Sequence, residues 1–187
     1  VDTQTLGSYS ITYNVTDSNG NIADEVIRTV IVADSTPPVI SLIGASPVTI
    51  EVGSTYTDLG ATAEDNYDGD ITSSIVVGGA TVDTQTLGSY SITYNVTDSN
   101  GNIADEVIRT VIVADSTPPV ISLIGASPVT IEVGSTYTDL GATAEDNYDG
   151  DITSSIVVGG ATVDTQTLGS YSITYNVTDS NGNIADE

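Results

Sequence analysis

The stretch AEDNYDGDITSS concentrates acidic residues and occurs twice, at positions 63–74 and 144–155. Its first copy places four acids within seven positions, at Glu64, Asp65, Asp68 and Asp70. Two like charges about 4 Å apart repel by roughly 4 kcal/mol at an effective dielectric constant of about 20. Because the chain has 26 acidic residues and two basic ones, a bound divalent cation is the most direct way to offset this repulsion. Calcium suits such a site, since it takes about six to eight oxygen ligands in flexible geometry.

The rest of the composition indicates a folded β protein and excludes several classes of function. Val, Ile, Thr and Tyr, which favour strands, accompany a net charge of −24. The chain has no Cys, Lys or His, so it has no residue for a disulfide, a Schiff base or imidazole catalysis. Two arginines are too few to neutralise nucleic-acid phosphates, and no run of about 18 apolar residues is present. We therefore expect neither nucleic-acid binding nor membrane insertion of this segment.

The sequence repeats itself with a period of 81 residues, because residues 1–25 recur at 82–106 and at 163–187. Everything between these copies recurs as well. A period of this length suits one small domain per repeat, with each repeat contacting its neighbours.

The segment VADSTPP, at 32–38 and 113–119, is the natural boundary between repeats. Its two prolines stop a strand and stiffen the linker into an extended form. We predict three domains: the C-terminal part of a repeat (1–35), a complete repeat (36–116) and a repeat that lacks its last strand (117–187).

Within the complete repeat, short segments alternate between apolar and polar residues in the way that half-buried strands do. In the clearest of them, Tyr90, Ile92 and Tyr94 alternate with polar residues. The expected strands cover 39–43, 48–52, 56–63, 71–77, 82–86, 89–97 and 104–113. Seven short strands separated by turns predict an all-β sandwich, and the absence of a 3.6-residue period predicts essentially no helix.

Three segments, STPPVISLIG, GATAEDNYDGDIT and GSYSITYNVTDSNGNIA, occur in this order in each full repeat. Together they resemble the bacterial immunoglobulin-like (Ig-like) surface repeats related to hyalin-type modules, over the whole repeating unit. The resemblance implies tandem Ig-like β-sandwich domains of about seven strands each, strung along large secreted or surface-anchored bacterial proteins that are often adhesins. It carries over no catalytic residues.

Ig-like topology would bring the acids together at one end of each sandwich. The loop at 64–70 lies at the same end as the turn at 98–102, and the preceding linker arrives there. We therefore predict calcium at each junction between domains. The candidate ligands at the first junction are Asp34, Asp65, Asp68, Asp70, Asp98, Asn100 and Asn102. Those at the second are Asp115, Asp146, Asp149, Asp151, Asp179, Asn181 and Asn183.

The alternative to a calcium site is a set of plain turns, because Asp, Asn and Gly are also ordinary turn residues. Salt screens charges in solvated loops over about 8 Å. An EF-hand is excluded, since its loop requires a bidentate Glu at the position that Ile75 occupies. Arg28 and Arg109 are expected to bridge to a carboxylate on a neighbouring strand.

These features predict a structural spacer or stalk at the bacterial surface, in which calcium stiffens the junctions between repeats. One alternative is an extracellular filament of identical chains joined head-to-tail, in which residues 23–34 of one chain complete the last domain of another. Another is a glycan- or protein-binding module, although the sequence has no Trp or Phe for sugar stacking. An enzyme is not expected. Asp65 and Asp68 resemble the carboxylate pair of glycoside hydrolysis, but so small a sandwich leaves little room for a pocket.

Overall fold

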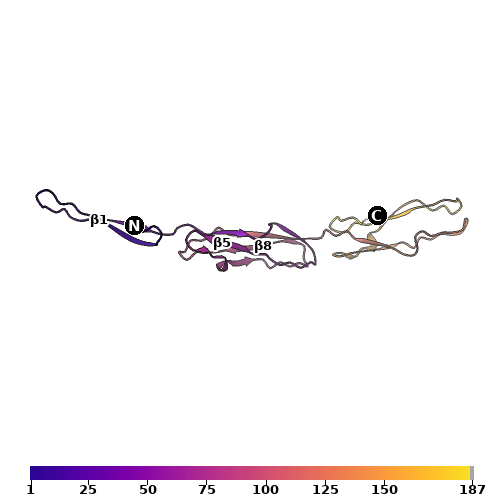
Figure 1. Ribbon diagram of the computed structural model, residues 1–187. Coiled ribbons are helices and arrows are strands. Elements are labelled where there is room, and N and C mark those ends of the chain that lie inside the picture. Colours follow the sequence, from indigo (N-terminus) through magenta and orange to yellow (C-terminus); the bar gives the residue numbers. More distant parts are fainter. Residues whose placement is uncertain (186–187) are drawn as a thin grey trace. The chain divides into compact units, whose positions relative to one another are not determined.

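The computed structural model describes residues 1–185, which form strands, turns and irregular segments (Figure 1). No α-helix occurs in this part of the chain, as predicted, although two 3-10 turns do, at Thr72–Ser74 and Thr153–Ser155. The chain divides into two compact units. One consists of residues 1–46, 58–80 and 91–109, and the other of residues 47–57, 81–90 and those from 110 onward.

The complete repeat has seven strands in two sheets, which confirms the predicted all-β, Ig-like sandwich. The strands are β3 (Val39–Leu42), β4 (Val48–Glu51), β5 (Ala61–Asp65), β6 (Gly69–Asp70), β7 (Val76–Gly79), β8 (Gly88–Asn95) and β9 (Val107–Ala114). One sheet has the order β3-β5-β6 and the other the order β4-β9-β8-β7. Strands β4 and β9 run parallel, with Val48 opposite Val111 and Glu51 opposite Ala114.

Three of the predicted strands were wrong in extent or existence, and β6 lies in the segment 64–70 that was predicted as a loop. The segment 56–63 becomes a strand only at Ala61, and in the segment 71–77 a 3-10 turn precedes a strand that starts at Val76. The segment 82–86 forms a turn. There the carboxylate of Asp83 accepts hydrogen bonds from the Gln85 amide and the Thr86 hydroxyl. Such local side-chain bonds compete with a strand ladder.

Arg109, a buried residue of β9, contacts residues that follow β3, residues that precede β5, and Tyr94 on β8. Arg109 is 2% exposed, and its Nε lies 2.8 Å from Asp58 Oδ1. Its terminal nitrogens donate to the backbone carbonyls of Ile43, Ala45 and Gly60. Tyr94 donates to Asp58 Oδ2 at 2.5 Å, and burial together with this bond raises the pKa of Tyr94. Arg109 therefore pairs with a carboxylate as predicted, but Asp58 precedes β5 and does not lie on a strand.

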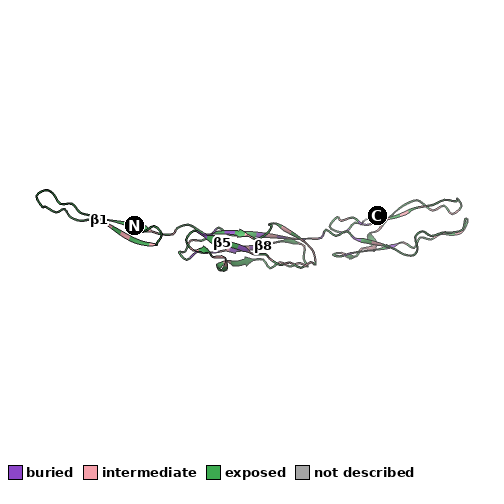
Figure 2. Cartoon of the chain, in the orientation of Figure 1, coloured by how far each residue is buried: buried purple, intermediate pink, exposed green. Residues whose placement is uncertain are grey.

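The first 32 residues form an antiparallel hairpin of β1 (Gly7–Tyr13) and β2 (Val26–Val32). Its residues are mainly exposed, whereas the same sequence in β8 and β9 contributes buried residues (Figure 2). Tyr13 is 48% exposed, and its counterpart Tyr94 is fully buried. Identical sequence thus reaches different burial according to what packs against it.

The third repeat has two small sheets, with the orders β10-β11-β12 and β13-β14. These strands are β10 (Val120–Leu123), β11 (Ala142–Asp146), β12 (Gly150–Asp151), β13 (Val157–Gly160) and β14 (Ile173–Asn176). Ala144, Val177 and Ala185 form its buried core. Residues 129–132 repeat the sequence of β4 but form no strand.

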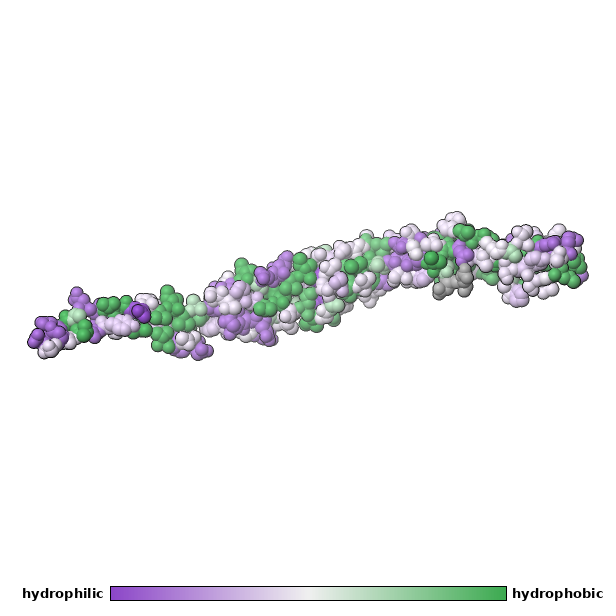
Figure 3. All heavy atoms as spheres, turned by 90° about the horizontal axis from the view of Figure 1, so that it is seen from above, coloured by the Kyte–Doolittle hydropathy of each residue, from purple (hydrophilic) through white to green (hydrophobic). Residues whose placement is uncertain are grey.

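Apolar side chains are also exposed at many separate positions, including Ile22, Ile31 and Leu168. Figure 3 shows hydrophobic residues interspersed with hydrophilic ones on the face that is seen. Within residues 1–185, no helix has the length and apolar character needed to cross a membrane.

Candidate metal centre

Three carboxylates from separate elements meet within the first compact unit. Asp34 lies between β2 and β3, Asp65 ends β5, and Asp98 lies in the turn between β8 and β9. One carboxylate oxygen from each lies within 4.8 Å of those from the other two. Asp65 and Asp98 are each 8% exposed, and Asp34 is half-buried. We call these three residues the first carboxylate group.

The second carboxylate group consists of Asp115, Asp146 and Asp179, which occupy the corresponding positions 81 residues later. Their oxygens also lie within 4.8 Å of one another. All three residues are buried, with exposed fractions of 9%, 9% and 8%. Burial is the largest influence on Asp115 and raises its pKa, and the nearby charge of Asp146 adds to the rise. The second group therefore gathers negative charge where water cannot stabilise it well.

Backbone amides just after β5 hold the Asp65 side chain in place. Its Oδ1 accepts hydrogen bonds from the backbone amides of Tyr67 and Asp68, at 2.8 and 2.9 Å. Such local bonds are typical of Asp at a turn, and they fix the side chain so that Oδ2 is buried. At β11, Asp146 is held in the same way by Tyr148 and Asp149.

Among residues 1–185, Asp65 Oδ2 and Asp146 Oδ2 are the buried side-chain oxygens that lack a hydrogen-bond partner. A buried polar atom without a partner is costly and calls for an explanation, such as an ion. Each of these atoms belongs to a different carboxylate group. The donor set and the unpartnered oxygen both fit a hard divalent cation.

The turn that follows β8 holds Asp98 through its own backbone. Asp98 Oδ1 accepts from the amides of Asn100 and Asn102, and its Oδ2 accepts from the Asn102 side chain at 2.6 Å. Burial raises the pKa of Asp98, but these hydrogen bonds outweigh it and leave the pKa lowered. Asp98 is therefore held in place as a charged member of the first carboxylate group.

Asparagine side chains border both carboxylate groups. Asn100 Nδ2 donates to Asp34 Oδ2 at 3.2 Å, and Asn102 Nδ2 donates to the Asp34 carbonyl at 3.4 Å. At the second group, Asn181 and Asn183 make the corresponding bonds to Asp115. Rotation of an asparagine amide by half a turn exchanges its donor for an acceptor oxygen, so these side chains offer further ligands.

The remaining predicted ligands lie outside the two carboxylate groups. Asp68 accepts from the Ser99 amide and hydroxyl, both at 2.7 Å, so it ties the acidic loop to the turn after β8. Asp70 is exposed and accepts from the Thr72 amide, and bonds from Thr72 lower its pKa. Their counterparts in the third repeat, Asp149 and Asp151, make the same contacts to Ser180 and Thr153.

One acidic residue beside the second group was missed by sequence reasoning. Glu51, at the end of β4, accepts hydrogen bonds from Ser116, Thr117 and Asn147. Bonds from the Ser116 side chain have the largest influence, and they help lower the pKa of Glu51 from 4.5 to about 2. Its position follows from the parallel pairing of β4 with β9, which sets Glu51 opposite Ala114. Strand alternation alone does not reveal that pairing.

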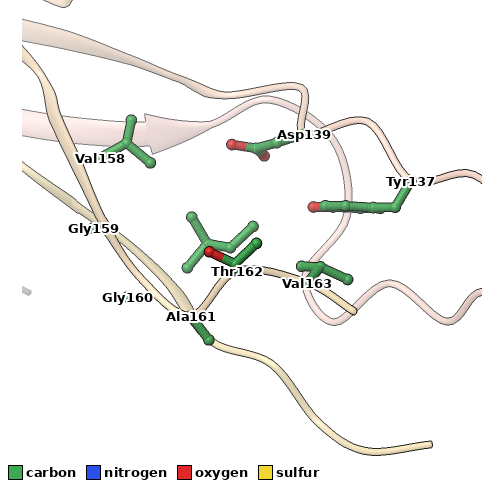
Figure 4. Close-up of a pocket in the computed structure, with 9 residues that line it drawn as sticks. Tyr137, Asp139, Val158, Gly159, Gly160, Ala161, Thr162 and Val163 are labelled. Carbon is green, nitrogen blue, oxygen red and sulfur yellow. The ribbon is translucent and has the colours of Figure 1, made fainter. Parts of the chain in front are cut away.

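A separate open pocket of about 430 Å³ lies in the third repeat. Figure 4 shows Tyr137, Asp139 and Thr162 among the side chains that line it. Asp139 accepts a hydrogen bond from Tyr175, and it corresponds to Asp58, which pairs with Arg109 in the complete repeat. We therefore assign this pocket to the framework of the sandwich.

Comparison with known proteins identifies related sequences across nearly the whole chain. The family described as "Bacterial surface protein, Ig-like domain" matches residues 1–32, 40–113 and 121–187. The pesticidal crystal protein Cry22Aa of Bacillus thuringiensis is 31% identical over 197 aligned positions, which cover 100% of this chain and 26% of that protein. Hyalin of Strongylocentrotus purpuratus is 30% identical over 190 positions, which cover 98% of this chain and 16% of hyalin.

A solved lipoprotein structure from Bacteroides thetaiotaomicron aligns with a TM-score of 0.38 and 20% identity. The alignment covers 76% of this chain and 61% of that one. Of the two curated relatives, Cry22Aa and hyalin, the chain spans about a quarter or less of the length.

Proposed function

Because the chain belongs to the family of bacterial surface proteins with Ig-like domains, we propose that it is a non-enzymatic structural spacer of a surface or secreted protein. In this proposal, tandem sandwiches extend the protein away from the cell, and calcium bound at the junctions stiffens the array. Copying a repeat lengthens a spacer without changing its contacts, since each repeat touches only its neighbours. Strands β8 and β9 have eight residues each, so a complete repeat adds at least roughly 25 Å.

The observation that most directly supports calcium binding is that each carboxylate group contains one buried oxygen without a hydrogen-bond partner. Each group takes one carboxylate from the linker and two from the repeat that follows it, namely Asp34 with Asp65 and Asp98, and Asp115 with Asp146 and Asp179. A cation bound by all three would fix the linker to that repeat. Extracellular calcium modules bind at about 10⁻⁴–10⁻³ M, which suits a protein outside the cell.

Calcium should therefore change the dimensions of the chain in solution. We expect small-angle X-ray scattering to give a larger radius of gyration and maximum dimension in calcium than in chelator, because a fixed linker restricts bending. The double variant Asp65→Asn/Asp146→Asn should give the same dimensions in both buffers. Unchanged dimensions for the wild type would contradict the stiffening role. A particle mass that grows with protein concentration would instead support head-to-tail assembly.

A further inference from the structure

We propose that Glu51 is a positioning residue that couples the second carboxylate group to the repeat before it, and this inference rests on the proposed cation site. Through Glu51, the complete repeat would set the cation affinity of the site at the start of the next repeat.

The contacts of Glu51 reach the residues next to two of the three carboxylates. Its Oε2 accepts from the Ser116 amide at 3.0 Å and from the Ser116 hydroxyl at 2.6 Å, directly after Asp115. Its Oε1 accepts from Asn147 Nδ2 at 3.2 Å, directly after Asp146. One side chain of the preceding repeat thus holds both the linker and the acidic loop. Movement of either would displace a ligand of the second group.

Four donors engage the Glu51 carboxylate, since Thr117 Oγ1 also lies 2.8 Å from Oε1. Glu51 is not among the carboxylates whose oxygens converge in the second group. Its oxygens accept from donors of the linker and the loop, and it also interacts with the Asp115 side chain. We therefore assign it to the support of the site and not to the ligands. Such outer partners orient metal ligands and affect affinity strongly.

The first carboxylate group shows the same sequence without this contact. There Asn66, the counterpart of Asn147, donates instead to Asp34 Oδ1 at 3.5 Å. Asp34 is half-buried, whereas its counterpart Asp115 is 9% exposed. Asp115, beside which Glu51 lies, is therefore more enclosed than its counterpart Asp34.

Terbium titration of the full chain tests the proposal, with Tyr67 and Tyr148 in the acidic loops as sensitisers and calcium as competitor. The Asp65→Asn background leaves only the second site. There Glu51→Gln should weaken terbium and calcium binding roughly tenfold, because a glutamine offers one acceptor to four donors. Glu132→Gln is the matched control, since Glu132 has the same local sequence but is exposed. It should leave the affinity unchanged.

A neutral substitution separates positioning from simple charge attraction. Thr117→Val removes one donor to Glu51 and keeps every charge, so it should weaken the second site by roughly fivefold, as for the loss of one hydrogen bond. Its matched control is Thr36→Val, measured at the first site in the Asp146→Asn background. Melting in chelator checks that Glu51→Gln and Glu132→Gln are both folded at the temperature of the titration.

The outcomes distinguish this inference from the function on which it rests. If neither site binds terbium or calcium, the proposed function fails. If both sites bind and Glu51→Gln matches Glu132→Gln, the coupling through Glu51 is overturned while the calcium sites stand. If Glu51→Gln weakens binding but Thr117→Val does not, Glu51 acts by its charge alone, and its positioning role is overturned.

Discussion

Replacement of Asp65 by asparagine is expected to stabilise the calcium-free protein and to destabilise the calcium-loaded protein relative to the wild type. Without calcium, the buried Asp65 Oδ2 lacks a hydrogen-bond partner and its carboxylate faces Asp34 and Asp98. An asparagine keeps the Oδ1 acceptor for the amides of Tyr67 and Asp68, and it turns an amide donor toward the neighbouring carboxylates. The free energy of unfolding in chelator should therefore rise by roughly 1 kcal/mol, the net value of one hydrogen bond.

Calcium should reverse this order, because the ion stabilises only the form that binds it. At 100 times its dissociation constant, a ligand stabilises the folded state by about 2.7 kcal/mol. Each kcal/mol shifts the melting temperature of a domain of this size by about 4–8 °C. The wild-type transition should thus climb by roughly 10–20 °C, and Asp146→Asn should remove the corresponding shift at the second group.

Thermal unfolding in calcium, magnesium and chelator, followed by circular dichroism, measures this reversal. The control is Asp70→Asn, because Asp70 has the same charge and lies just after the same loop but is exposed and outside the carboxylate group. It should respond to calcium as the wild type does. Equal calcium shifts for the wild type and for Asp65→Asn would remove Asp65 from any ion site.

Replacement of Arg109 by methionine should lower the free energy of unfolding of the complete repeat by roughly 3 kcal/mol, as expected for breaking a buried ion pair. Methionine fills part of the space but offers no donor to Asp58. The backbone carbonyls of Ile43, Ala45 and Gly60 also lose the hydrogen bonds that the arginine donates to them. Because Arg109 is 2% exposed, water cannot easily replace these bonds.

Arg28→Met is the matched control, since Arg28 has the same sequence neighbours but is exposed. It lies over the Tyr13 ring at 5.9 Å, and loss of such an exposed contact costs no more than about 1 kcal/mol. Urea unfolding monitored by tyrosine fluorescence compares the two variants. Equal losses of stability would show that the contacts around Asp58 do not decide the stability of the repeat.

The sequence predicts the fold class well because strand alternation and turn residues are local signals. The extent of each strand is harder to predict, as a comparison of the repeats shows. The sequence VTIE forms β4 at 48–51, where β9 pairs with it, and forms no strand at 129–132. Likewise, Tyr13 is 48% exposed and Tyr94 is fully buried, although both lie in the same local sequence. Pairing partners and packing, which no local pattern contains, decide these outcomes.

The candidate site was predictable to the extent that topology alone places residues. Ig-like connectivity sends the linker, the acidic loop and the last turn to one end, and Asp34, Asp65 and Asp98 meet there. It does not show which carboxylates turn inward. Asp68 turns instead to Ser99. Glu51 escaped notice because its place depends on a parallel strand pair.

The most direct measurement is a crystal structure of this chain grown in calcium, with anomalous diffraction data to identify the ions. We expect one calcium ion in each carboxylate group, at about 2.3–2.6 Å from its ligand oxygens, with Asp65 Oδ2 and Asp146 Oδ2 among them. Density in both groups that refines as water, with no anomalous signal, would contradict it.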